Sequence, residues 1–273
     1  MIKIENTQIF GLEPAIRGMR SPKNSWDRSD SMWCIAGDPK GEGDYYTCRD
    51  CPLGTGNPSI DCDCPGCITE YALGPNDLEL AKKLVTGGPV HAKFRRMITV
   101  YCDITAPLYW WKEYDTYKVG TVANSTSTMH KIHAKEFTLD DFSHEHLLTR
   151  EDVLFEDPNV EEEHSKIGAL AAVDVNGHAC YYTSEGFLKM TCDVLNYFRE
   201  LYLKTKDKTY WWQMIQLLPS SYNQKRTVML NYEVLANIYK WRKDHKLDCW
   251  HTFCDWIESL PYSELITGEK KEE

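Results

Sequence analysis

The placement of cysteine constrains this chain more than any other feature of its sequence. The chain has eleven cysteines, and six of them fall between residues 34 and 67. The segment 34–68 is rich in glycine and proline and poor in apolar residues, which is typical of a loop-like insertion that needs a staple. The core of the fold must therefore come from the sequence on either side of this insertion.

The spacing of these cysteines favours a structural metal site. Cys48-x2-Cys51 and Cys64-x2-Cys67 are two pairs, each of which lets both thiolates reach one ion, and tetrahedral zinc takes four such ligands. We therefore predict one structural zinc ion on Cys48, Cys51, Cys64 and Cys67, with Cys62 as a substitute ligand. Free thiols in a loop and an iron–sulfur cluster are the alternatives.

Composition and charge limit the class of protein. The chain has 273 residues, a formal net charge of −10 and 42% hydrophobic residues, which is a globular composition. Its acidic balance supplies no basic face, so no nucleic-acid polymer is expected as a partner. The sequence has no long apolar run, and we expect neither a membrane span nor secretion. We predict a cytoplasmic protein with one domain over residues 1–273, which contains the insertion 34–68.

Apolar periodicity predicts helices and strands on both sides of the insertion. Met97–Ile104 predicts a strand with much of both faces buried, and Asn76-Asp77 predicts a helix cap. Val119–Thr128 predicts a polar loop, and Asn176-Gly177 predicts a hairpin. Further helices are predicted after Pro107 and around residues 188–203, 211–217, 230–238 and 250–257.

Two groups of polar residues have the chemistry to bind a ligand. The first follows the helix after Pro107, where Lys118 and the hydroxyl and amide side chains after it suit a phosphate or a sugar. In the second, Asn231 and Asn237 are six residues apart, and we expect them on roughly one side of a helix, suited to the edge of a heterocycle. Arg242 would then bind an anion or a pyrimidine carbonyl. A solvated loop and an ordinary amphipathic helix are the alternatives.

Together these motifs resemble the flavin-dependent thymidylate synthase family. In that family a strand ends in Ala-Pro, as at Ala106-Pro107, and enters a helix. That helix leads to an Arg-His-Arg motif, where this chain has Thr116-Tyr117-Lys118. The family also has a Leu-Pro turn and then an Asn-x-Arg motif, which align with Leu218-Pro219 and Asn231-Tyr232-Glu233.

Several cations of that family are missing from this chain. Only the last cation of Arg-His-Arg survives, as Lys118, and Glu233 replaces the arginine of Asn-x-Arg. Met129 and Ile215 stand where the family has two further arginines. Each lost charge-assisted hydrogen bond costs about 1.5–3 kcal/mol, so we expect weaker dUMP binding or another substrate. The cations that could compensate are Arg20, Lys23, Lys112, Lys131, Lys225 and Arg226.

The resemblance covers residues 76–131 and 186–257 and implies both a fold and an activity. The implied fold is α+β, with a mostly antiparallel sheet packed with helices, assembled as a homotetramer. The implied activity is that of an FAD-dependent thymidylate synthase-like methyltransferase, which transfers a methyl or one-carbon group to a pyrimidine deoxynucleotide (dUMP to dTMP or a related reaction). FAD would be the cofactor, with NADPH and methylenetetrahydrofolate as co-substrates. A nucleotide- or flavin-binding protein of the same fold without that activity is the alternative.

The resemblance also implies roles for individual residues. The implied cofactor-binding residues are Lys118, Thr121, Asn124, Asn231 and Asn237. The implied substrate-binding residues are Glu113, Thr116, Ser127 and Arg242. FAD would lie between the Lys118–Ser127 loop of one subunit and the helix carrying Asn231 and Asn237 of another. The family needs no cysteine nucleophile, and the sequence identifies no catalytic residue.

Overall fold

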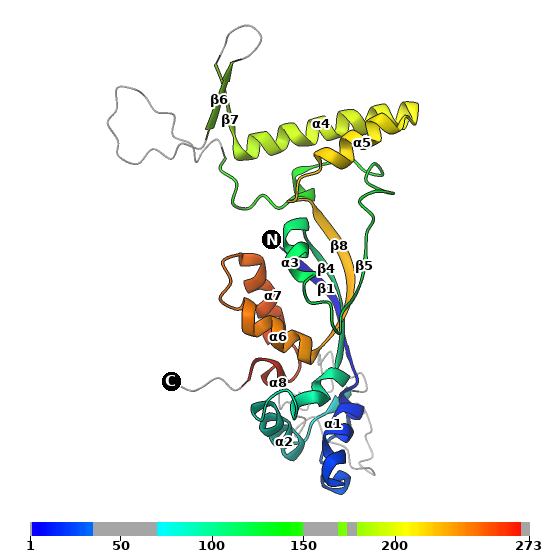
Figure 1. Cartoon of the computed structure of the whole chain (residues 1–273), viewed down its shortest axis with the longest axis vertical. Coiled ribbons are helices and arrows are strands. Elements are labelled where there is room, and N and C mark those ends of the chain that lie inside the picture. The colour runs from blue at the N-terminus through cyan, green and yellow to red at the C-terminus, as the bar shows by residue number, and fades with distance from the viewer. Residues whose placement is uncertain (1, 35–69, 150–168, 174–178, 269–273) are drawn as a thin grey trace, which may run out of the picture. The chain divides into compact units, whose positions relative to one another are not determined.

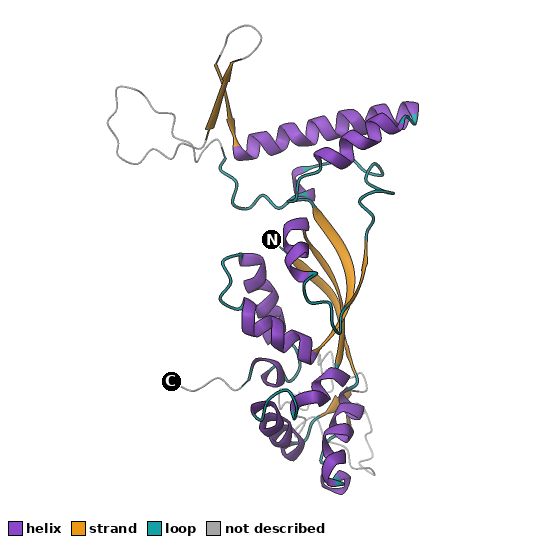
Figure 2. Ribbon diagram, viewed as in Figure 1, coloured by secondary structure: helices purple, strands orange, loops and turns teal. Residues whose placement is uncertain are grey.

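The computed structural model describes residues 2–34, 70–149, 169–173 and 179–268 (Figures 1 and 2). The protein is α+β, with an antiparallel sheet packed against helices, which confirms the predicted fold class. The strands are β1 (Lys3–Phe10), β2 (Met32–Cys34), β3 (Glu70–Ala72), β4 (Thr99–Pro107), β5 (Val122–Ser125), β6 (Ala169–Val173), β7 (Ala179–Thr183) and β8 (Asn223–Asn231). The α-helices are α1 (Leu12–Arg20), α2 (Pro75–Thr86), α3 (Leu108–Tyr114), α4 (Ser184–Thr205), α5 (Lys208–Leu217), α6 (Tyr232–Arg242), α7 (Asp248–Glu258) and α8 (Glu264–Thr267), and the 3₁₀ segment η3 covers Ala92–Met97.

The main sheet has the strand order β1-β4-β8-β5. Strand β4 alternates strictly: Val100, Cys102 and Ile104 are buried, whereas Tyr101 is 41% exposed. Alternation with a period of two residues marks a strand with one buried and one open face. The prediction that both faces of this strand are largely buried is therefore wrong.

The chain divides into two compact units, each described by itself. The first comprises Met1–Glu5, Asp103–Thr116 and Ala123–Thr227, and the second comprises Asn6–Cys102, Tyr117–Val122 and Val228–Glu273. Among the described residues of both units, no helix is long and apolar enough to cross a bilayer.

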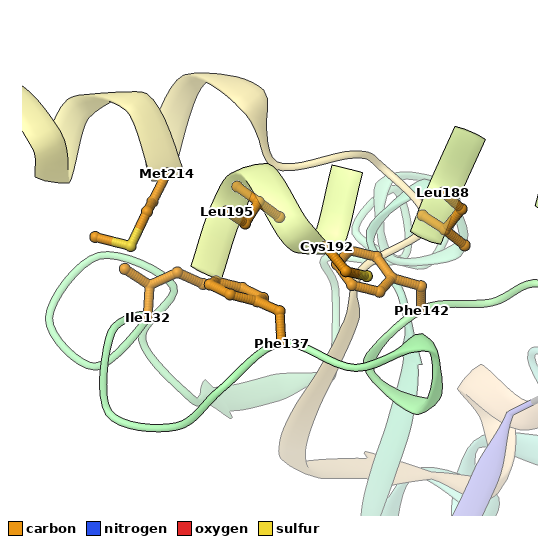
Figure 3. Close-up of a cluster of buried hydrophobic side chains, with 7 residues drawn as sticks. All are labelled: Ile132, Phe137, Phe142, Leu188, Cys192, Leu195 and Met214. Atoms are coloured by element: carbon orange, nitrogen blue, oxygen red, sulfur yellow. The ribbon is translucent and has the colours of Figure 1, made fainter. Parts of the chain in front are cut away.

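In the first unit, helices α4 and α5 lie side by side over an apolar cluster (Figure 3). The cluster is formed by Ile132, Phe137, Phe142, Leu188, Cys192, Leu195 and Met214. Strands β6 and β7 pair antiparallel from Ala169↔Thr183 to Val173↔Ala179, which confirms the predicted hairpin. The Thr183 side chain then accepts a hydrogen bond from the Gly186 amide and caps α4.

The second unit holds helices α6, α7 and α8, which pack on one another (Figure 1). On α7 the side chains of Trp250, Phe253, Cys254 and Ile257 are all buried, which confirms the helical spacing seen in the sequence. Helix α6 begins only at Tyr232, whereas Leu230 belongs to β8.

A buried carboxylate ties the start of α2 to the segment around residues 20–31. Asp77 has no exposed surface and accepts hydrogen bonds from Arg20 Nε at 2.5 Å, Ser29 Oγ at 2.6 Å and Ser31 Oγ at 2.6 Å. The α2 amide groups of residues 76 and 77 are instead capped by the carboxylate of Asp30, at 2.8 and 3.0 Å. The prediction that Asn76-Asp77 caps this helix is therefore wrong, because the capping carboxylate comes from far away in the sequence.

Two further predictions concern the loop at residues 119–128 and the insertion at residues 34–68. The predicted polar loop Val119–Thr128 contains strand β5, whose four residues are exposed. The predicted insertion 34–68 lies almost wholly outside the described residues. Its two ends enter an antiparallel ladder in which Met32 pairs with Ala72 and Cys34 with Glu70.

Candidate functional site

The turn 117–122 lies against the first turn of α6 in the second unit. Gly120 has φ +79°, and a Cβ there would lie 3.0 Å from Asn231 Nδ2 and 3.1 Å from Val234 Cγ2. Glycine is therefore required both by the backbone conformation and by the close approach. Thr121 Oγ1 donates to the Tyr117 carbonyl at 2.5 Å, which closes the turn. The sequence thus brings two predicted cofactor-binding residues, Thr121 and Asn231, into one local structure.

Asn231 is the N-cap of α6. Its Oδ1 accepts a hydrogen bond from the Val234 amide at 3.0 Å, so the side-chain oxygen serves the helix. Six residues correspond to about 600° of rotation around a helix, which leaves Asn237 about 120° away from Asn231. The prediction that these two amides share one side of a helix is therefore wrong.

Asn237 lines a groove of about 410 Å³ on another face of α6. The residues that line it include the apolar Val85, Pro89 and Ile266, the ion pair of Arg95 and Glu233, and the lysines Lys240 and Lys243. Asn237 itself is exposed. Polar and charged side chains make up much of the lining, so the groove is suited to a ligand that carries polar or charged groups.

Arg242 lies against two aromatic rings. Its guanidinium carbon lies 4.6 Å from the ring centroid of Trp250 and 5.6 Å from that of Tyr117. Its Nε donates to the Tyr117 hydroxyl at 3.0 Å. Trp250 is fully buried, so the platform under the guanidinium is rigid. A guanidinium fixed in this way is suited to a phosphate or a carbonyl group.

Glu233, which aligns with the arginine of the Asn-x-Arg motif, forms an ion pair with Arg95 of η3. Arg95 Nη2 lies 2.6 Å from Glu233 Oε2, and Arg95 Nη1 donates to the Leu265 carbonyl at 3.0 Å. The Arg95 side chain is only 8% exposed. A guanidinium is therefore present beside α6, but it belongs to another segment and is engaged by this carboxylate.

The predicted substrate-binding residues of the first unit are mostly used in local structure. Thr116 Oγ1 donates to the Glu113 carbonyl at 2.7 Å, at the end of α3. Ser127 Oγ accepts hydrogen bonds from the amides of Met129 at 3.3 Å and His130 at 2.9 Å. Asn124 is exposed on β5. Within the ranges that the structure describes, these side chains are not brought together in one site.

Half of the cations proposed to compensate for lost arginines are committed to ion pairs. Arg20 is paired with Asp77. Lys225 lies 3.2 Å from Asp103, and Arg226 lies 2.7 Å from Asp115. The remaining three are exposed: Lys23, Lys112 and Lys131. Lys118 is exposed too and has no ion-pair partner within the described part of the chain.

Ile215 and Met129, which align with two further arginines of the motifs, lie in different surroundings. Ile215 packs against the apolar cluster of the first unit. Met129 is 53% exposed, and its carbonyl accepts a hydrogen bond from Trp211 Nε1 at 3.0 Å. An isoleucine in a core contact offers no donor to a phosphate.

The predicted zinc ligands Cys48, Cys51, Cys64 and Cys67 lie outside the described residues, so this site remains a prediction. Within the described ranges no group of three or more histidines, cysteines and carboxylates is placed to hold a metal. Four cysteines there are free and buried and belong to the core: Cys102, Cys192, Cys249 and Cys254. Burial, with nearby carboxylates, raises the pKa of Cys254 to about 12, so its thiol is no nucleophile at neutral pH.

The roles of three residues in the second unit were not predicted from the sequence. Gly120 and Trp250 stand in the sequence as an ordinary loop glycine and a core tryptophan, and their roles depend on the approach of distant segments. Arg95 is 138 residues from its partner Glu233. The only local sign was a pair of adjacent arginines, Arg95-Arg96, directly before a strand.

The sequence matches no protein-family model and no curated protein. The fold is similar to that of thymidylate synthase X (ThyX) from Helicobacter pylori, crystallised with FAD and dUMP, with 14% identity, 98% of each chain covered and a TM-score of 0.55. A second structure of this flavin-dependent enzyme with FAD and dUMP gives the same identity and TM-score over 97% of this chain and 98% of the other. A UMP/dUMP methylase, PolB from Streptomyces cacaoi, bound with 5-Br dUMP, has 12% identity, a TM-score of 0.49 and 98% and 95% coverage. At such identities the likeness shows the fold alone, which is similar to that of a flavin-dependent thymidylate synthase.

Proposed function

We propose that this chain binds FAD and a pyrimidine deoxynucleotide and transfers a methyl or one-carbon group to the nucleotide, converting dUMP to dTMP or performing a related reaction. NADPH and methylenetetrahydrofolate would be the co-substrates. The fold supports this proposal, because the similar Helicobacter pylori structures contain FAD and dUMP. The observation that carries it in this chain is the rigid seating of Arg242 on Trp250 and Tyr117.

The second unit offers suitable partners for the nucleotide. Arg242 presents a planar cation for a phosphate or a pyrimidine carbonyl. Lys118 and Thr121 belong to the turn that begins at Tyr117, which is the residue that holds Arg242. The proposed role of these side chains is to bind and orient the nucleotide and the flavin phosphates.

The groove at Asn237 fits part of a flavin. Its apolar residues Val85, Pro89 and Ile266 offer contact to a ring system, the Asn237 amide can both donate and accept at a ring edge, and Lys240 and Lys243 suit a pyrophosphate. When bound, reduced flavin would supply a hydride. The part of the protein would be to bind and orient the ring.

We propose a site shared between two copies, and the geometry of α6 supports it. Asn237 and Arg242 are five residues apart, which places them about 140° apart around the helix axis. One ligand on one face of α6 cannot contact both residues of the same chain directly. We therefore propose that Asn237 of one subunit and the Lys118–Ser127 segment of another hold the same FAD, in a homotetramer.

Three tryptophans of α3 and α7 cannot drive assembly, because they are buried within the chain. Trp110, Trp111 and Trp250 are at most 1% exposed, so the aromatic faces of α3 and α7 offer no surface to a partner. Helix α4 does offer one. Phe187, Met190, Val194 and Tyr197 recur at spacings of three and four residues and are 56%, 39%, 37% and 60% exposed. This apolar seam lies away from the buried face of α4, which is formed by Leu188, Cys192 and Leu195.

Val194→Glu should break the assembly into smaller species. A carboxylate in the middle of the apolar seam would have to lose its water when the seam is covered by a second copy. Light scattering at micromolar concentration should show a multimer for the unchanged protein and a smaller mass for the variant. Leu203→Glu is the matched control, because Leu203 is exposed on α4 outside the seam. An unchanged protein that is monomeric would refute the assembly.

Asn237→Ala should weaken FAD binding about tenfold. The loss of two hydrogen bonds of about 0.5–1.5 kcal/mol each gives an effect of that size. The measurement is a titration followed by flavin absorbance, together with mass spectrometry of the small molecules that co-purify with the protein. Lys246→Ala, at an exposed lysine beyond the end of α6, serves as the control. Equal FAD affinity in the Asn237→Ala variant and the unchanged protein would rule out this groove.

A second candidate function is flavin or nucleotide binding without thymidylate synthase activity. The arginine position occupied by Glu233 is closed by the ion pair with Arg95, and Ile215 is packed in an apolar cluster. Both observations favour weaker retention of a nucleotide phosphate than in the related family. A turnover assay with FAD, NADPH, methylenetetrahydrofolate and dUMP separates the candidates: FAD binding without formation of dTMP supports the second.

A further inference from the structure

His133 lies in the first unit on a loop that is anchored in the apolar cluster. Its neighbour Ile132 is buried against α4 and α5, so Lys131 and His133 flank an anchored position (Figure 3). The His133 carbonyl accepts a hydrogen bond from Arg199 Nε at 3.1 Å. The His133 ring meets the Tyr202 ring edge to face, with centroids 4.9 Å apart. One hydrogen bond and one ring contact with α4 therefore fix the position of this histidine.

The charges around His133 are all positive. Lys131 comes from the same loop, Arg199 comes from α4, and Lys206 stands at the end of α4 with its Nζ 5.8 Å from the Tyr202 ring centroid. Burial lowers the pKa of His133, and the charges of Lys206, Lys131 and Arg199 lower it further. Among the described residues no carboxylate offsets these cations at the ring. These three cations form a positively charged cluster in a chain whose net charge is −10.

Burial of Nδ1 leaves Nε2 as the ring nitrogen of His133 that can contact a ligand. Nδ1 is buried and has no hydrogen-bond partner among the described residues. Protonation of Nδ1 would bury an unsatisfied N–H group, which is costly. The neutral ring therefore carries its proton on Nε2, which can donate it to an oxygen.

A helix end alone does not account for this cluster. Lys206 closes α4 in the left-handed conformation with φ +59°, where a cation is favoured by the negative helix terminus. That effect falls off within the last turn and does not explain why Lys131 of a separate loop comes to the same place. Arg199 uses only its Nε in a hydrogen bond within the described structure.

We propose that Lys131, Arg199 and Lys206 bind the phosphate group of a small phosphorylated ligand beside the His133–Tyr202 ring pair. A phosphate offers several acceptor oxygens, and lysine and arginine are its preferred partners in proteins. The aromatic edge of Tyr202 and the Nε2 proton of His133 complete a site for a phosphate monoester. This proposal does not depend on FAD binding or on Arg242.

The His133 pKa is the direct readout. In protein labelled at histidine, inorganic phosphate should raise the pKa of His133 in an NMR titration, because a bound anion stabilises the charged ring. A rise with inorganic phosphate or with dUMP supports the site, and the comparison tells free phosphate from a nucleotide phosphate. If neither raises this pKa, or if deoxyuridine without a phosphate does so equally, the proposal fails.

Charge-removing variants test which cations take part. Lys131→Gln and Lys206→Asn should each weaken phosphate binding about tenfold, and asparagine tolerates the left-handed backbone at position 206. Lys204→Gln is the matched control, because Lys204 is exposed on the same helix end and does not act on the pKa of His133. Equal weakening by the control would show diffuse attraction to a charged surface and overturn the site.

Discussion

Replacing Asp77 by alanine should lower the free energy of unfolding by about 3–5 kcal/mol. The carboxylate is fully buried and is paired with Arg20, which is itself only 5% exposed. Its removal leaves a buried guanidinium without its counter-ion and the hydroxyls of Ser29 and Ser31 without their acceptor. Chemical denaturation followed by tryptophan fluorescence would measure this loss.

The matched control for this prediction lies on the same helix. Glu79 also pairs with a cation, Lys83, but both side chains are about two-thirds exposed. Glu79→Ala should leave the unfolding midpoint almost unchanged, since an exposed pair of this kind contributes little. If both variants lose the same stability, the buried network has no special importance.

Stability should also fall in acid through the same carboxylate. Burial alone would raise the pKa of Asp77, but the hydrogen bonds from Ser29, Ser31 and Arg20 outweigh it and hold the pKa below its ordinary value of 3.8. A carboxylate with a lowered pKa in the folded state stabilises above its unfolded pKa, and the contribution disappears as pH falls through the folded value. Below about pH 4 the unchanged protein should therefore lose stability, and an Asp77→Asn variant should lack this part of the acid dependence.

Replacing Arg242 by alanine should weaken binding of a pyrimidine nucleotide by about 10- to 100-fold. The loss of charge-assisted hydrogen bonds of about 1.5–3 kcal/mol gives this range. The variant would lose the cation that lies against Tyr117 and Trp250, 4.6 Å from the Trp250 ring centroid. Calorimetric titration of dUMP into the unchanged protein and the variant measures the difference.

Two further variants make this result specific. Arg242→Lys retains the charge but loses the planar group, so it should bind with intermediate affinity. Tyr117→Phe removes only the hydroxyl that accepts from Arg242 Nε and should have a smaller effect than the loss of the arginine. Nucleotide binding that is indifferent to all three variants would remove Arg242 from the site.

The sequence predicted local structure better than long-range partners. The burial of Trp250, Phe253 and Ile257 on α7 follows from spacing alone, because helical periodicity is a local property. The pairings of Asp77 with Arg20 and of Glu233 with Arg95 join residues 57 and 138 positions apart. No local pattern in the sequence indicates such pairs. The prediction that Asn231 and Asn237 lie on one side of a helix is wrong because Asn231 is the last residue of β8 and only caps α6.

The candidate site shows the same division. Polar side chains around residues 116–131 predict a ligand-binding segment, but the structure uses Thr116 and Ser127 to satisfy neighbouring backbone groups. The aromatic seat of Arg242 could not be predicted, since it depends on how a turn and α7 approach α6.

The ladder between β2 and β3 means that the cysteine-bearing segment can differ in length without a change in the strands that flank it. Because Cys34 pairs with Glu70, the described residues on either side of the segment 35–69 are neighbours in one ladder, as the two strands of a hairpin are. The entropy of closing such a connection grows slowly, by about 0.6 kcal/mol for each doubling of length. The length of this segment is therefore free to change between related chains while the frame that carries Arg242 stays the same.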